Sequence, residues 1–265
     1  MPAHNDNIVD QFTRQAVPFS TAPAIRDAQA LQLLVEAAGT VTDDTVLDVA
    51  CGPGLVACAF AAVARHVTGI DLTPAMLDRA RQLAGEKQVT NVTFQVGDVI
   101  HLPFADASFS IVVSRFAFHH FRDPGAVLVE MKRVCRPGGR VVVADLTASS
   151  DPAKAEAFHR MEILRDPSHA RALTLVELRG LFARAGLGEP VATPWSFEVE
   201  VEALLARSFP DEGSAPAIRR MLADSVADDA MGVGTRIVDG GVRFTYRNVV
   251  LTATLPAPAP SPSRV

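Results

Sequence analysis

A carboxylate and two glycines stand close together in the stretch TVLDVACGPGLVACAFA, residues 45–61. Asp48 ends an apolar run, and Gly52 and Gly54 follow within GPGLVA. This pattern matches the G-x-G-x-x-G/A turn that places a dinucleotide pyrophosphate at a helix N-terminus. Two features argue against a bound phosphate. Pro53 has no N–H to donate to it, and the negative charge of Asp48 would repel it. The turn therefore indicates a ligand that is positively charged at this point.

S-adenosylmethionine has the required chemistry, since it carries an α-ammonium, a sulfonium and an adenosine but no phosphate. The carboxylate of Asp48 can serve the ammonium directly or through water, while the glycines let the backbone approach the ligand closely. The alternative is that Asp48 caps the following helix at an ordinary tight turn. We expect S-adenosylmethionine as the cofactor and S-adenosylhomocysteine as its product.

Two further carboxylates follow apolar runs at suitable intervals. Asp71, in GIDLTPAML, closes the second expected strand, where a carboxylate can accept hydrogen bonds from both ribose hydroxyls. Asp98, in QVGDVIHLPF, closes the third, where it and the Val99 amide can address the amino edge of adenine. A single Asp after a strand is common, but three successive strands that end in this way indicate a nucleoside site.

Five motifs carry a family resemblance: VLDVACGPG, GIDLTPAML, GDVIHLPF, SRFAFHHFRDP and MKRVCRPGGRVVVAD, in this order. They resemble the class I S-adenosylmethionine-dependent methyltransferases, and most of all the ubiquinone/menaquinone C-methyltransferase-like small-molecule branch. The resemblance implies a seven-stranded sheet whose last strand runs antiparallel. It also implies cofactor contacts at Asp48, Ala50, Gly52, Gly54, Asp71, Leu72, Met76, Gly97, Asp98, Val99 and either Arg115 or the backbone near Ser114. Ala50 departs from the common motif, which has a glycine there.

Three histidines are candidates for proton transfer to or from an acceptor. Methyl transfer from a sulfonium mainly requires that the acceptor is positioned and desolvated, and a base contributes where the acceptor must lose a proton. His119 and His120 follow the fourth expected strand, and His169 lies in RDPSHAR after the fifth. Our hypothesis is that His119, the first choice, or His169 deprotonates or orients the acceptor. The alternatives are a structural role for the His119–His120 pair and a solvated ion-pair turn around His169.

Alternating short apolar runs and helical patterns must position these residues. They predict an α/β fold, Rossmann-like, with a seven-stranded mostly parallel sheet, helices on both faces and a helical cap formed by insertions. The ligand would then lie beyond the carboxyl ends of the strands. We expect one domain over residues 1–255, divided into N-terminal cover helices (1–40), a cofactor-binding core (41–146) and cap insertions with the last strands (147–255), followed by a disordered tail (256–265).

The composition excludes several classes of partner. A net charge of −5 argues against nucleic-acid and acidic-membrane surfaces. Three scattered cysteines favour a reducing compartment without a disulfide framework, and no signal-peptide core or long apolar run is present. A cytoplasmic monomer or homodimer is expected. The histidines His4, His66, His101 and His159 show no ligand spacing or clustering, so no metal site is predicted.

The expected function is S-adenosylmethionine-dependent methyl transfer to an O, C or N nucleophile of a small, hydrophobic or aromatic metabolite. Phe116, Phe118 and Phe121, with Phe12 and Phe19, are candidates to line the acceptor pocket, and core packing is the alternative for at least two of them. Three other functions stay open. They are a non-methylating reaction on the same fold, such as a cyclisation or dehydration, an NAD-dependent oxidoreductase, and a non-catalytic cofactor sensor.

Overall fold

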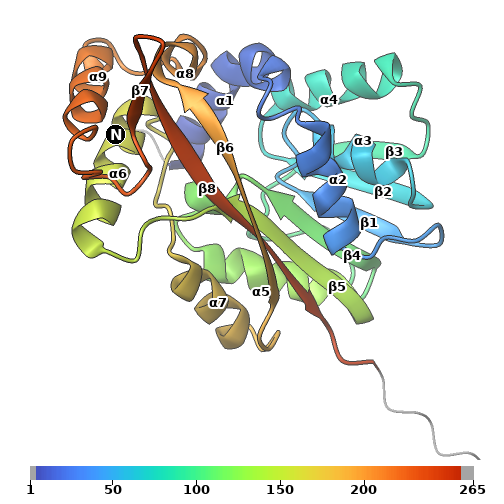
Figure 1. Ribbon diagram of the computed structural model, residues 1–265. Helices are drawn as coiled ribbons and strands as arrows, with labels where there is room; N and C mark the ends of the chain where they lie inside the picture. Colours follow the sequence, from blue (N-terminus) through green and yellow to red (C-terminus); the bar gives the residue numbers. More distant parts are fainter. Residues whose placement is uncertain (1–3, 258–265) are drawn as a thin grey trace, which may run out of the picture.

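A computed structural model describes residues 4–257 of the chain (Figure 1). In the first half, strands and helices alternate: α1 (His4–Thr21), α2 (Ala28–Ala37), β1 (Thr45–Val49), α3 (Leu55–Ala61), β2 (His66–Asp71), α4 (Pro74–Glu86), β3 (Val92–Val96), β4 (Phe109–Arg115), a 3₁₀ turn (Phe118–His120), α5 (Pro124–Val134) and β5 (Cys135–Leu146). The second half contains α6 (Pro152–Arg165), α7 (Leu175–Arg184), β6 (Val191–Glu200), α8 (Val201–Ser208), α9 (Ser214–Asp224), β7 (Arg236–Val238) and β8 (Gly241–Thr254).

The strands form one sheet in the order β3-β2-β1-β4-β5-β8-β6, with β7 paired to β8. Strands β1 to β5 run parallel, and β8 pairs antiparallel with both β5 and β6. The expected mostly parallel sheet and the antiparallel last strand are therefore confirmed. Over residues 4–257 the sheet has eight strands rather than the expected seven, because β7 adds a short hairpin in which Val238 pairs with Gly241. The Asp239-Gly240 pair at its turn is the signal that predicts such a hairpin.

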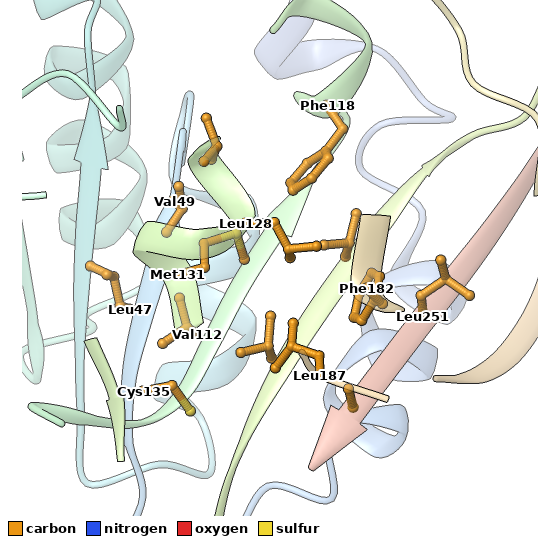
Figure 2. Packing of buried hydrophobic residues seen from close by; sticks show 14 of the residues in the cluster. Leu47, Val49, Val112, Phe118, Leu128, Met131, Cys135, Phe182, Leu187 and Leu251 are labelled. Atoms are coloured by element: carbon orange, nitrogen blue, oxygen red, sulfur yellow. The ribbon is translucent and has the colours of Figure 1, made fainter. Parts of the chain in front are cut away.

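Both faces of the central parallel strands β1 and β4 are buried, which is why these segments are rich in apolar residues. On one face, Leu47 and Val49 pack towards α5 and α7, as Figure 2 shows with Leu128, Met131 and Phe182. On the other face, α2 and α3 contribute residues such as Leu34 and Phe60 to a second cluster. The central sheet is thus a rigid layer between helices, and only its strand ends are free to bind a ligand.

The predicted helical cap is present beyond the carboxyl end of β5. Leu146, the last residue of β5, pairs with Asn248, and β6 and β8 continue past this point as a two-stranded ribbon. Helices α6, α8 and α9 pack on the ribbon around a third apolar cluster that includes Phe158 and Ile218. Figure 1 shows these helices gathered beside α1 at one end of the sheet. The insertions therefore cover the strand ends.

Two predictions concern residues at the ends of the chain that the structure does not describe. Residues 1–3 of the expected cover and residues 258–265 of the expected disordered tail lie outside the described residues. Within residues 4–257, no helix combines the length and the apolar composition needed to cross a bilayer.

The turn between β1 and α3 depends on left-handed backbone conformations. Gly52 and Gly54 have φ angles of 51° and 76°, and Ala50 has 56°. A Cβ atom on Gly54 would lie 2.8 Å from the Cβ of Ala80 and 3.1 Å from the ring of Phe94, whereas a Cβ on Gly52 would meet nothing within 4 Å. Gly54 thus allows α3 to start directly against α4.

Replacement of the two glycines by alanine should separate backbone strain from steric conflict. We expect Gly52→Ala to lower the free energy of unfolding by about 1–2 kcal/mol through strain alone. Gly54→Ala should cost about 1–3 kcal/mol more, because Ala80 and Phe94 must also move. Urea unfolding of both variants measures the difference. Equal losses for the two variants would contradict the close packing of α3 against α4.

Candidate active site

A cavity of about 420 Å³ lies at the carboxyl ends of β1, β2 and β4, beneath α1. Eight of the predicted cofactor-binding residues line it, and they come from four separate segments of the chain: Ala50, Gly52, Asp71, Leu72, Met76, Asp98, Val99 and Arg115. The four others lie behind its wall: Asp48, Gly54, Gly97 and Ser114. Ser114 donates its hydroxyl to the carbonyl of Val49 (2.9 Å), which gives it a structural contact between β4 and β1.

Asp71 is held in place by two backbone amides. Its Oδ2 accepts from the N–H of Gly52 and its Oδ1 from the N–H of Thr73, each at 2.8 Å. Burial raises the pKa of the Asp71 carboxyl, and these hydrogen bonds act in the opposite direction. Each carboxylate oxygen has a second lone pair. The side chain therefore keeps acceptor capacity towards the cavity while its orientation is fixed.

Asp48 and Arg115 form a pair of opposite charges with unused hydrogen-bonding atoms. Asp48 is 1% exposed, and its Oδ2 has no hydrogen-bond partner among the described residues. Arg115 donates from Nη1 to the carbonyl of Ile25 (3.0 Å), but its buried Nε and Nη2 also have no partner there. Burial raises the pKa of Asp48 well above its ordinary value and lowers that of Arg115 to about 10. Buried polar atoms without partners are costly, so these atoms indicate a ligand.

The N-terminal helix closes the cavity from above. Asn5 on α1 donates from Nδ2 to the Oδ2 of Asp98 (3.0 Å), while the N–H of Ile100 donates to its Oδ1 (3.0 Å). Gln11 anchors α1 at the cap, since its Nε2 donates to the carbonyl of Ser208 (2.6 Å). The expected N-terminal cover thus contacts both the core and the cap.

A second cavity of about 80 Å³ adjoins the first and shares part of its wall. The shared residues are Phe12, Phe19, Ile25, Phe116 and His120. Of the phenylalanines predicted to line an acceptor pocket, Phe121 borders the first cavity but not the second. Phe118 is 2% exposed and packs in the core with Leu128, so the alternative of core packing holds for this residue (Figure 2).

The structure brings the candidate histidines together in one cluster. His119 lines the second cavity, and its Nδ1 lies 2.6 Å from Oδ1 of the buried Asp145. His120 lines both cavities. The ring centroid of His169 lies 5.5 Å from that of His119, but His169 borders a third cavity instead. The ring centroid of His159, a residue without ligand spacing in the sequence, lies 5.4 Å from that of His169.

Burial controls the protonation of two of these rings. It lowers the pKa of His120 to about 3, with a further contribution from the neighbouring His119, and it also lowers the pKa of His169. Both nitrogens of His169 are buried without a partner in the described part of the chain. Among residues 4–257, no group of His, Cys, Asp or Glu side chains is arranged to hold a metal ion.

Several residues around the second cavity were not identified from the sequence: Asp145, Glu162, Arg165, Arg207, Tyr246 and Asn248. A signal existed for Asp145, because it stands near the end of an apolar strand just as Asp71 does. The others come from α6, α8 and β8. Only the packing of the cap on the ribbon brings them together.

The lowered pKa of His120 should appear in the pH dependence of stability. Between pH 6.5 and about 3 the unfolded chain binds a proton at this ring and the native protein does not, so His120 destabilises the fold as the pH falls. From pH 7 to pH 5 we expect the wild type to lose roughly 2 kcal/mol more than His120→Asn, at about 1.4 kcal/mol per pH unit below 6.5.

Urea unfolding at the two pH values measures this difference. The raised pKa values of Asp48 and Asp71 oppose the trend equally in both proteins, so the comparison isolates His120. His101→Asn, at an exposed position, is the control. Parallel pH profiles for wild type and His120→Asn would contradict a ring that stays neutral in the fold.

Comparison with known proteins shows to which family a chain with this architecture belongs. Residues 47–143 match the family described as "Methyltransferase domain". The uncharacterized methyltransferase YcgJ of Bacillus subtilis is 32% identical over 208 residues, which span 78% of this chain and 80% of that protein. Demethylmenaquinone methyltransferase of Deinococcus radiodurans is 46% identical over 102 residues, 38% of this chain and 42% of that protein.

The fold is also similar to solved structures of proteins from the same group, the methyltransferases. The crystal structure of YcgJ from Bacillus subtilis superposes with a TM-score of 0.79 at 28% identity, covering 87% of this chain and 99% of that one. A putative methyltransferase from Bacillus halodurans gives a TM-score of 0.80 at 26% identity, with 87% and 100% coverage. The chain therefore belongs to the methyltransferase domain family, among the class I methyltransferases whose cofactor is S-adenosylmethionine.

Proposed function

We propose that this protein transfers the methyl group of S-adenosylmethionine to a nucleophilic O, N or C atom of a small molecule bound in the second cavity. The observation that carries the proposal is the Asp48–Arg115 pair, in which Arg115 lines the first cavity and Asp48 lies buried behind it. The methionyl part of the cofactor is a zwitterion, and a buried carboxylate and a buried guanidinium with unused hydrogen-bonding atoms match its two charges.

The remaining wall fits the rest of the cofactor. Arg115 would hold the methionyl carboxylate, and Asp48, directly or through water, the ammonium. Asp71, oriented by the amides of Gly52 and Thr73, would accept from the ribose hydroxyls. Asp98 and the amide of Val99 would address adenine, and Leu72 and Met76 supply apolar wall. When bound, S-adenosylmethionine supplies the electrophilic methyl group.

His119 and Asp145 supply the base in this proposal. Asp145 also accepts from the N–H groups of Phe118 and Leu146, each at 2.6 Å, so its carboxylate is fixed. A carboxylate on Nδ1 keeps a proton on that nitrogen and leaves Nε2 of His119 as the acceptor. His119 would take the proton of the nucleophile as its new bond to the methyl carbon forms. The carbon–sulfur bond breaks at the same time, which yields methylated acceptor and S-adenosylhomocysteine.

Calorimetric titration with S-adenosylmethionine, S-adenosylhomocysteine and NAD tests the cofactor site. We expect both adenosyl ligands to bind and NAD not to bind. Arg115→Met should weaken their binding by about 10–100-fold, since a hydrogen bond to a charged group contributes about 1.5–3 kcal/mol. Arg136→Met, which removes an exposed arginine of β5, is the matched control. Binding of NAD alone, or unchanged binding by Arg115→Met, would contradict the proposed site.

Binding should also release a proton from Asp48. Burial raises the pKa of this carboxyl in the free protein, and an ammonium placed beside it would lower that pKa again. We expect a release at pH values between the pKa of Asp48 in the free protein and its pKa in the complex, and Asp48→Asn should abolish it. Calorimetry with S-adenosylhomocysteine in buffers of different ionisation enthalpy measures the release. An enthalpy that is independent of the buffer for the wild type would place the ammonium elsewhere.

A further inference from the structure

The second cavity contains a charge network that is internally satisfied. Glu162 is 0% exposed, accepts from the hydroxyl of Tyr246 (2.7 Å) and pairs with Arg165 (2.6 Å). Asp166 lies 3.6 Å from Arg165 and also accepts from the N–H of Ser168 (2.9 Å). These acids and Arg165 are therefore occupied with one another and with neighbouring donors, and they are not free to bind an acceptor.

Arg207 is different from the charged residues around it. It comes from α8, is half-buried and lines the same cavity. No hydrogen bond or ion pair joins it to any residue between 4 and 257, although Arg165 and Tyr246 influence it electrostatically. Burial lowers its pKa, which shows that its charge is partly removed from water. A guanidinium in this position is suited to a planar anion, which it can bind through two parallel hydrogen bonds.

Asn248 provides a second unused polar atom in this cavity. The residue is 3% exposed, and its Nδ2 donates to the carbonyl of Tyr246 (3.0 Å). Its Oδ1 is buried and has no donor among the described residues. A buried carbonyl oxygen without a donor is costly, so a ligand that donates a hydrogen bond would remove this cost. Among the described residues that line it, the cavity thus presents one cation and one acceptor without partners, Arg207 and the Oδ1 of Asn248.

The walls between these polar atoms are aromatic. Phe12 and Phe19 come from α1, and Phe116 and Phe197 come from the ends of β4 and β6. The rings of Phe116 and Phe197 meet edge to face with centroids 6.0 Å apart. Phe116 adopts a φ of 56°, a strained conformation for a bulky residue of the kind that accumulates at ligand sites. Such walls favour a flat ring.

We infer that the methyl acceptor is a small aromatic acid, with its carboxylate on Arg207 and a hydrogen-bond donor on the Oδ1 of Asn248. This inference rests on the proposed function and names the acceptor class of the same site. The expected acceptor class, a hydrophobic or aromatic metabolite, is thereby restricted to aromatic molecules that carry a negative charge. Arg207 then acts as a specificity-determining residue that holds the acceptor beside His119.

The test measures binding to the S-adenosylhomocysteine complex of the full chain, so it does not depend on turnover. The probes are 2-, 3- and 4-hydroxybenzoate and the three matching hydroxybenzamides, titrated by calorimetry. We expect at least one acid to bind, and to bind at least 10-fold more tightly than its amide. Arg207→Met should remove this preference, and Arg207→Lys should retain part of it. Arg220→Met, at an exposed arginine of α9, should leave it unchanged.

The affinity of each variant for S-adenosylhomocysteine reports that the protein is folded. Equal binding of acid and amide, no binding of any acid, or a preference that survives Arg207→Met would overturn the inference and leave the cofactor site untouched. Failure of the wild type to bind S-adenosylhomocysteine would instead overturn the proposed function as well. The two proposals therefore fail in distinguishable ways.

Discussion

The carboxylate of Asp71 joins two loops on which the first cavity depends. It accepts from the backbone of Gly52, in the turn after β1, and from that of Thr73, at the start of α4. Since β1 and β2 are parallel neighbours, both turns emerge at the same edge of the sheet. A buried acceptor shared by two backbone donors fixes their relative position and faces the cavity at the same time. Fold and site are therefore specified by the same side chain.

The N-terminal helix α1 extends this arrangement from the first cavity to the second. Phe12 and Phe19 on α1 and Phe116 after β4 border both cavities, so one aromatic wall separates them. The helix α1 is attached through Asn5, near its start, to the core and through Gln11, near its middle, to the cap. Methyl transfer depends on alignment of the donor and the acceptor, and a shared rigid wall sets that alignment.

Part of the site could be predicted because the Rossmann-like topology converts sequence order into position. Asp71, Asp98 and Arg115 follow successive strands of a parallel sheet, so their proximity in space follows from their place after each strand. Asp48 and Ser114 also stand at or near the ends of strands, but neither borders the cavity, and the hydroxyl of Ser114 donates to the carbonyl of Val49 within the sheet. Sequence alone does not state on which side of the backbone the cavity opens.

The sequence predicted a helical cap, but it did not predict which residues of the cap line the second cavity. Glu162, Arg207 and Asn248 are separated by up to 86 residues in the numbering and follow no motif, yet they line one cavity. His119 and His169 were both candidates for the base. Their rings are neighbours in the structure, but they border different cavities. Their burial and their partners depend on how α6 and α8 pack on the ribbon of β6 and β8.

The amino-acid sequence by itself determined the α/β class, the family and the polar strand ends of the cofactor cavity, because strand periodicity and turn chemistry are local properties. Only the tertiary structure decided which atoms are left without partners, which histidine lies against Asp145 and which side chains line the second cavity. The physical reason is that the burial and the hydrogen-bond partners of a side chain depend on residues that are distant in the chain. A local sequence pattern does not contain this information.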